Sequence, residues 1–263
     1  MSLFADMTYE SARSITGPFL LALGATGAVV GFISGLGEFL GYGLRIVSGW
    51  IADKTGKYWS ITIAGYLINL LSVPALALVG QWQLAAILIM AERIGKAVRN
   101  PSRDAMLSHA TVEIGRGWGF GLHEAMDQIG AMLGPLIIAG VFYFHGGYRE
   151  AFGVLIIPAV LAISILFFAR FLYPSPKDLE VSTAKIEIKG LSKVYWIYLI
   201  AVALNGAGYA DFPLIAYHFK KVATVSEQWI PVFYAIAMGV DALAAFFLDI
   251  YLIERGFQFL FFQ

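Results

Sequence analysis

Acidic and basic side chains recur inside the apolar stretches of this sequence, where ionised groups are costly to place. Asp6, Glu10 and Arg13 are four and three residues apart in the first stretch, so on a helix they share one face. An ionised group at the centre of a bilayer costs roughly 2.5–3.5 kcal/mol on insertion scales, and such groups usually pair or face a cavity. These residues predict a site for a polar solute or a proton. The alternative is an internal ion pair that only fixes helix packing.

A second polar pattern lies in the fifth apolar stretch. His123, Asp127, Gly130 and Gly134 follow steps of three or four residues, which predicts a helical stripe that is polar at one end and small at the other. We expect a coupling or gating role for His123 and Asp127, the alternative being an interhelical hydrogen bond. The full set of candidates for the path of substrate or protons is Asp6, Glu10, Arg13, Glu38, Arg45, Arg93, His123, Asp127 and Asn205.

Three more basic residues, Lys96, Arg99 and Arg103, lie near the end of the fourth stretch or just after it. We expect them at the membrane interface, where they extend toward water or bind lipid phosphate. In the second half the polar candidates are fewer, with Asn205, Asp211 and Asp241 in or beside the last two stretches.

The chain has no recognisable catalytic constellation. It contains no cysteine, and its 4 histidines are scattered over different segments, which is a poor pattern for a metal site. Neither an H-E-x-x-H pair, a G-x-S-x-G elbow nor a phosphate-binding P-loop occurs. We therefore predict no catalytic residues, no metal and no cofactor. A formal net charge of zero also argues against a nucleic-acid partner.

The elements that position these residues are predicted to be membrane-spanning helices. Hydrophobic residues make up 59% and charged residues 14% of the 263 residues, and mean hydropathy is +0.74. The apolar residues form continuous blocks of about 20, which favours helices over a barrel. About eight spans are expected: Leu3–Leu23, Ala25–Trp50, Trp59–Val79, Leu84–Val98, Gly117–Phe144, Ala151–Leu172, Val194–Ala216 and Ile230–Leu248.

The loops are unequally charged, and this predicts the orientation. Most basic loop residues fall on one side: Lys54, Lys57, Arg99, Arg103, Arg116, Arg170, Lys177, Lys185, Lys189 and Lys193. The other side carries only Arg149, Lys220 and Lys221. By the positive-inside rule the richer side is cytoplasmic, so an even number of spans places both termini in the cytoplasm. We expect a multi-pass protein of the plasma membrane that contacts membrane lipid.

The longest polar connector divides six spans from the last two. We expect an N-terminal six-helix bundle over residues 1–172, a cytoplasmic linker over 173–193 and a partial bundle of two spans over 194–263. Gly206, Gly208 and Pro213 predict that the seventh span is flexible or broken.

The loop after the second span carries a family signature. Gly49, Asp53, Gly56 and Lys57 resemble the G-x-x-x-D-x-x-G-[RK] motif of the major facilitator superfamily, which the family places between its second and third spans. Gly130, Gly134 and Pro135 are similar to the core of the family's fifth-helix antiporter motif. Arg93 stands in a segment similar to the fourth-helix motif that bears an arginine.

The resemblance implies an all-α membrane protein of the major facilitator fold. It further implies transport of a small, polar solute by alternating access, with proton coupling. Members of the family have two six-helix halves built from inverted repeats, so we expect this chain to be C-terminally truncated, with the first two helices of the second half. The alternative is a fragment inactive by itself, or a subunit that needs a missing C-terminal portion or a partner chain. Asp53 and Lys57 are expected to act in conformational change.

Overall fold

The computed structural model describes residues 1–112, 115–174, 192–208 and 211–254, and every regular element in these ranges is a helix. The helices are α1 (Ser2–Ala22), α2 (Gly27–Thr55), α3 (Tyr58–Ala75), η1 (Leu76–Leu78), α4 (Trp82–Ala110), α5 (Arg116–Tyr143), α6 (Tyr148–Val154), α7 (Ile156–Leu172), α8 (Lys193–Gly208), α9 (Phe212–Val222) and α10 (Trp229–Glu254). This is the all-α architecture that the apolar blocks predict.

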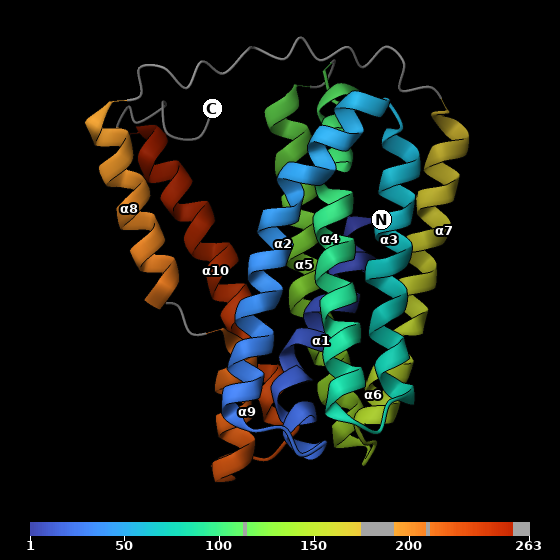
Figure 1. The fold of residues 1–263 in the computed structure, drawn as a ribbon, viewed down its shortest axis with the longest axis vertical. Helices are drawn as coiled ribbons and strands as arrows, with labels where there is room; N and C mark the ends of the chain where they lie inside the picture. Colours follow the sequence, from blue (N-terminus) through green and yellow to red (C-terminus); the bar gives the residue numbers. More distant parts are fainter. Residues whose placement is uncertain (113–114, 175–191, 209–210, 255–263) are drawn as a thin grey trace.

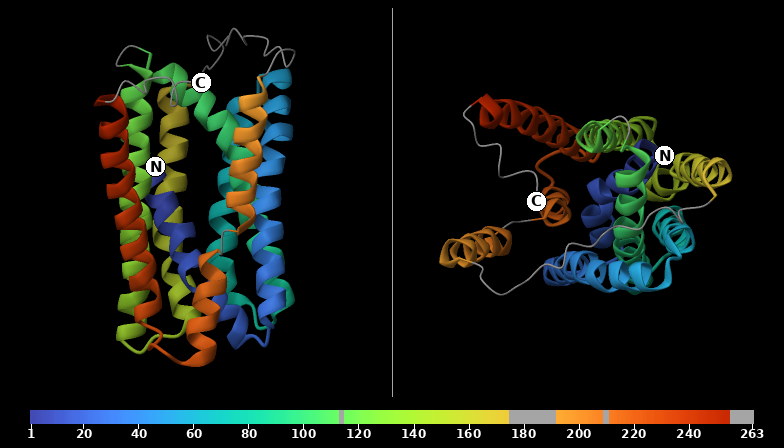
Figure 2. Two further views of the ribbon diagram at one scale, coloured as in Figure 1. Left: turned by 90° about the vertical axis from the view of Figure 1, so that its left-hand side faces the viewer. Right: turned by 90° about the horizontal axis from the view of Figure 1, so that it is seen from above.

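The long helices run up and down side by side (Figure 1). The turns before α2, α4 and α6 lie at the end where α9 lies, and the turn between α2 and α3 lies at the opposite end. Seen from above, α1 occupies the interior, with α2, α4, α5 and α7 around it (Figure 2). Most of α1 is buried accordingly, from Ala5 to Leu20, although the helix carries three charged side chains.

The eight predicted spans correspond to eight helical segments, with three differences. The sixth segment is divided at Leu155 into α6 and α7. The seventh is divided into α8, which ends at Gly208, and α9, which begins at Phe212, as the glycines and Pro213 predict. The third difference is the length of α4, which was predicted to end near Val98 and in fact continues to Ala110.

Helix α4 continues because its polar second half is packed against other helices. Asn100 and Ser102 are buried there. A prediction from hydropathy alone therefore ends the helix too early. Pro101 has no N–H, which leaves the carbonyl of Ala97 without its usual donor. The hydroxyl of Ser48 on α2 donates to that carbonyl at 2.9 Å, and the lost backbone bond is thereby replaced.

Glycines allow the interior helices to approach closely. A Cβ built at Gly95 of α4 would lie 2.4 Å from the backbone nitrogen of Asn69 on α3. A Cβ at Gly134 of α5 would lie 2.5 Å from the carbonyl oxygen of Met7 on α1, and one at Gly17 of α1 would lie 1.7 Å from that of Pro213 on α9. At these positions only the hydrogen atom of glycine fits against the neighbouring backbone without a steric clash.

The outer faces of the helices are apolar. Phe32, Phe39 and Ile46 of α2 and Phe168 and Phe171 of α7 are exposed. Within the described residues four segments are long and apolar enough to cross a membrane: Gly27–Thr55, Tyr58–Leu78, Gly117–Tyr143 and Tyr148–Leu172. Helices α1 and α4 run beside them but carry the charged residues that lower their hydropathy.

The predicted division into two bundles remains a prediction. Residues 175–191, which form most of the expected linker, lie outside the described ranges. Helices from the two sides of this segment do meet: α9 packs on α1 and α2, and α10 packs on α5.

We predict that Gly95→Ala lowers the stability of the helical core, because the new methyl group would displace the backbone of α3. Overpacking of this kind costs about 1–3 kcal/mol, and the melting temperature of the detergent-solubilised protein should fall. Gly35→Ala is the matched control, since a Cβ at Gly35 meets nothing within 4 Å. An equal response of the two variants would contradict the close contact.

Candidate functional site

Arg13 on the interior helix α1 joins three helices. Its Nη2 atom lies 2.8 Å from Glu38 Oε1 on α2 and 2.8 Å from Asp211 Oδ1 at the start of α9. Its Nε atom also donates to Asp211, at 3.3 Å. One guanidinium therefore holds two carboxylates that are far apart in the sequence.

Glu38 is shared with a second arginine. Arg93 Nη1 on α4 lies 3.3 Å from Glu38 Oε1, and Arg93 Nε lies 3.3 Å from Glu92 Oε2. The amide of Asn69 on α3 donates to the other oxygen of Glu92 at 3.0 Å. Arg13, Glu38, Arg93 and Glu92 thus form a continuous chain of charges from α1 through α2 to α4.

Glu10 continues this chain on α1, one turn before Arg13. Lys96 Nζ on α4 lies 3.5 Å from Glu10 Oε1, and the hydroxyl of Tyr234 on α10 donates to Glu10 Oε2. Glu10 is only 7% exposed. We call the residues Glu10, Arg13, Glu38, Glu92, Arg93, Lys96 and Asp211 the charge cluster.

Asp6 lies beside the charge cluster but, unlike the acidic residues of the cluster, it does not form an ion pair with a described residue. The hydroxyl of Tyr9 donates to Asp6, and the described residues contain no basic side chain within ion-pair distance of it. Lys96 lies 3.9 Å from the centre of the Tyr9 ring, so Tyr9 links the isolated carboxylate to the cluster. Asp6 is buried, with 6% exposure.

The structure brings together five of the predicted path residues and places a sixth nearby. Ion pairs join Arg13, Glu38 and Arg93. Glu10, one turn before Arg13, pairs with Lys96, and Asp6 lies next to them through Tyr9. Arg45 lines a small hollow with Arg13, Glu38, Arg93 and Lys96. The side chain of Asn205 lies outside the described residues, so its predicted role remains a prediction.

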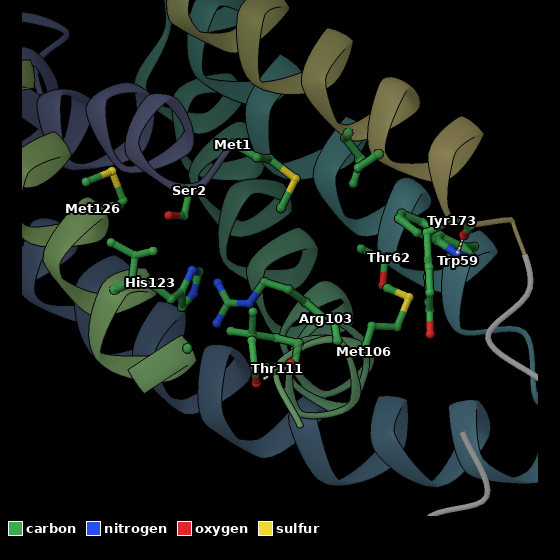
Figure 3. Close-up of a pocket in the computed structure, with 16 residues that line it drawn as sticks. Met1, Ser2, Trp59, Thr62, Arg103, Met106, Thr111, His123, Met126 and Tyr173 are labelled. Carbon is green, nitrogen blue, oxygen red and sulfur yellow. Dashed lines mark hydrogen bonds between the residues drawn. The ribbon is translucent and has the colours of Figure 1, made fainter. Parts of the chain in front are cut away.

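His123 and Asp127 form a separate pair on α5. His123 Nε2 lies 3.4 Å from Asp127 Oδ2. The imidazole also lines a cavity of about 420 Å³ between α1, α3, α4, α5 and α7. Figure 3 shows His123 and Arg103 pointing toward each other across this cavity. Its other polar lining includes Thr62 and Thr111, while most of the wall is apolar.

The interfacial position expected for Lys96 and Arg99 is wrong. Lys96 belongs to the charge cluster, and Arg99 is fully buried, with its guanidinium 4.2 Å from the centre of the Tyr66 ring and 5.5 Å from that of Tyr9. For Arg99 the physical reason is the continuation of α4 beyond Val98, which carries it into the bundle. For Lys96 it is the acid Glu10 on α1, which its side chain reaches across the helix interface. Arg103 is also mostly covered and pairs with Asp104 at 2.8 Å.

The loop signature has local structural roles. Gly56 ends α2 in the left-handed conformation, with φ of 64°, which favours glycine over other residues. Gly49 lies where a Cβ would be 3.4 Å from Pro101 of α4. Asp53 accepts from the hydroxyl of Tyr58 at 3.1 Å, and Lys57 is exposed just before α3.

The fifth-helix motif packs against α1. A Cβ at Gly130 would lie 2.3 Å from the carbonyl oxygen of Leu3. Gly134 faces Ser11 and Met7 in the same way, one turn further along. Pro135 lies inside α5, directly after this contact.

Sequence reasoning missed Tyr9, Lys96 and Tyr234 as parts of the site. A signal existed for Lys96, which lies four residues after Glu92 and three after Arg93 and so shares their helical face. Tyr9 and Tyr234 gave no signal, because aromatic residues are common throughout the chain.

The arrangement is suited to binding. Within the described ranges no group of three or more His, Asp or Glu side chains is placed to hold a metal ion. Paired carboxylates and cations around a hollow can bind a polar solute or exchange partners.

Comparison with known proteins identifies the family. The model of the Major Facilitator Superfamily matches residues 2–262, so the chain belongs to this superfamily and is a multi-pass membrane protein. This confirms the resemblance drawn from Gly49, Asp53, Gly56 and Lys57.

Three relatives illustrate the similarity. The chain is 42% identical over 252 residues to an uncharacterized protein of Mycobacterium tuberculosis, covering 93% of this chain and 62% of the relative. It is 28% identical over 225 residues to an uncharacterized MFS-type transporter of Methanocaldococcus jannaschii (84% and 56% covered). It is 29% identical over 179 residues to the multidrug resistance protein MdtH of Proteus mirabilis (67% and 42% covered). The chain therefore spans less than two thirds of the length of these relatives.

Solved structures support the fold. A peptide transporter POT mutant in complex with alafosfalin matches with a TM-score of 0.57 and 20% identity, over 78% of this chain and 42% of that one. The same transporter in complex with sulfate matches with a TM-score of 0.57 over 96% and 50% of the two chains. At this identity the likeness concerns the fold alone.

We predict that Lys96→Met is strongly destabilising, because it leaves Glu10 buried without its cation. Breaking a buried pair from one side costs about 3–5 kcal/mol, which denaturant unfolding in detergent can measure. The double variant Lys96→Met/Glu10→Gln should regain part of this loss.

The half-exposed pair of Lys220 and Glu227 provides the control for this prediction. Lys220→Met should change the free energy of unfolding by less than about 1 kcal/mol, since solvent screens such a pair. A Lys96→Met variant as stable as Lys220→Met would show that the Lys96–Glu10 pair is not a buried interaction.

Proposed function

We propose that this chain takes part in secondary transport of a small polar solute across the plasma membrane, by alternating access and coupled to protons. The observation that carries the proposal is the charge cluster, which joins α1, α2 and α4 to Asp211 of α9 and Tyr234 of α10. Ionised groups inside membrane helices are functional sites by default, and membership of the Major Facilitator Superfamily supports transport. No catalytic role is proposed.

Arg13 and Glu38 each have two partners of opposite charge, and this provides a basis for alternating access. Arg13 is held by both Glu38 and Asp211, and Glu38 is held by both Arg13 and Arg93. When α9 moves away from α1, Arg13 keeps Glu38 as its partner, and Asp211 exchanges Arg13 for water or solute. Two such arrangements of similar free energy are what a solute or a proton can select between.

We propose that Asp6 is the residue that binds and releases the transported proton. Burial without a counter-ion disfavours the ionised form of a carboxyl group, and among the described residues Asp6 has the Tyr9 hydroxyl as its hydrogen-bond partner. The charged groups that act on it electrostatically are Glu10 on α1, Lys96 on α4 and Asp127 on α5. A proton on Asp6 would change the charge seen by Lys96 and thereby its pairing with Glu10.

The orientation follows from the loop charges and is part of the proposal. With the turn between α2 and α3 in the cytoplasm, the close contact between Gly17 and Pro213 lies toward the outer end of α1. We propose that this contact closes the outer side and that both termini face the cytoplasm.

A second candidate is that the chain acts only within a longer polypeptide or an assembly. The observation that favours it is the coverage of 62% and 56% of two relatives. Flux by the purified chain alone would contradict this alternative.

We predict that Asp6→Asn abolishes solute-dependent proton movement, because an amide cannot take up and release the proton. The chain is reconstituted in vesicles that contain a pH-sensitive dye, and a panel of polar solutes is added with and without a pH gradient. Glu124→Gln is the control, since Glu124 is an exposed acid of α5 that contacts Gln128. Proton movement that survives Asp6→Asn would remove Asp6 from the mechanism.

A further inference from the structure

The lining of the hollow beside Arg45 contains more basic than acidic side chains. Its lining contains four cations, Arg13, Arg45, Arg93 and Lys96, and one acid, Glu38. Its volume is about 40 Å³, enough for roughly one water or one oxygen-bearing group. A Cβ at Gly41, which also lines it, would meet nothing within 4 Å, so the hollow is open along α2.

Arg45 differs from the other three cations. Arg13, Arg93 and Lys96 each lie within 3.5 Å of a carboxylate oxygen. Arg45 has no such partner among the described residues. Its Nε atom donates to the carbonyl of Gly41 at 3.1 Å, and its guanidinium lies 4.5 Å from the centre of the Tyr42 ring. These two contacts hold the group in place and leave its Nη atoms available.

The acidic side chains near the hollow are already paired with basic side chains. Glu10, Glu38, Glu92 and Asp211 all lie within 3.5 Å of an arginine or lysine nitrogen. A cationic solute would have to share a carboxylate that is already paired with an arginine or lysine. An anionic group needs to break none, because Arg45 offers a planar pair of donors that matches a carboxylate or phosphate.

We propose that this hollow binds the anionic group, carboxylate or phosphate, of a water-soluble solute, and that Arg45 is its principal ligand. Arg93 and Lys96, each paired with an acid of the charge cluster, line the hollow from the facing helix α4. The buried Oδ2 atom of Asp211 has no donor among the described residues and can accept a hydrogen bond from another part of the solute or from water. This inference names the substrate class of the proposed transporter and rests on that function.

The test measures equilibrium binding in neutral detergent at constant ionic strength. The probes are inorganic phosphate and succinate as anions, tetraethylammonium as a cation and glucose as a neutral solute. The melting temperature from tryptophan fluorescence should rise with the anions in a saturable way and stay constant with the other two. Stabilisation by tetraethylammonium equal to that by the anions, or none by either anion, would overturn the proposal.

Substitutions of residues that line the hollow test where the anion binds. Arg45→Ala should weaken the apparent affinity for phosphate about tenfold or more, as expected for a lost charge-assisted hydrogen bond. Arg45→Lys, which retains the charge but loses the planar fork, should weaken it less. Gly41→Leu should also weaken it by filling the hollow. Unchanged affinity in both Arg45→Ala and Gly41→Leu would place the anion elsewhere and overturn the proposal.

Lys54→Ala is the matched control, because Lys54 is a cation of the same helix that also lies over an aromatic ring, 4.7 Å from Trp50, outside the hollow. Its affinity for phosphate should equal that of the unchanged protein. A lipid arm adds phosphatidylglycerol in place of phosphate, and stabilisation by the lipid alone would overturn the assignment to a soluble solute. Because no gradient is involved, binding can be observed even if the chain moves no protons.

Discussion

Compensation of charge in an interior of low dielectric constant is the constraint on which this structure depends. Six ionisable side chains of α1, α2 and α4 and one of α9 lie close together, most of them buried or largely covered. Each can remain ionised only if an opposite charge lies within a few ångströms. The positions of the helices are therefore tied to the positions of these groups, and any movement of one helix must exchange partners and cannot simply separate them.

The close approach of the helices makes this compensation possible. Gly95, Gly134 and Gly17 bring α4, α5 and α9 to within backbone contact of their neighbours. Side chains of ordinary length then reach across the interface, as Lys96 reaches Glu10 and Arg13 reaches Asp211. Larger residues at the glycine positions would lengthen these distances and leave charges exposed to an apolar environment, so the glycines and the charge cluster form one structural unit.

Three functions meet on α1. Asp6 is the proposed proton site, Glu10 and Arg13 connect the neighbouring helices, and Arg13 lines the hollow in which we propose that an anion binds. These groups are four and three residues apart, so a change of charge at one is felt at the next within about one helical turn. Such proximity offers a direct electrostatic route between proton binding, solute binding and the contact of α1 with α9, without a long pathway through the protein.

The amino-acid sequence alone predicts the helical class, the break in the seventh expected span and the family signature around Asp53. It also determined that Asp6, Glu10 and Arg13 share one face, since helical periodicity is a local property. The pairing of the charges, in contrast, depends on how the helices pack in three dimensions. Lys96 was expected at the membrane interface and Tyr234 gave no signal, yet both contact Glu10, because a partner 86 or 224 residues away is chosen by how the helices pack. The length of α4 was decided in the same way: the bond that Pro101 removes is replaced by Ser48 of another helix, and no local pattern records that donor.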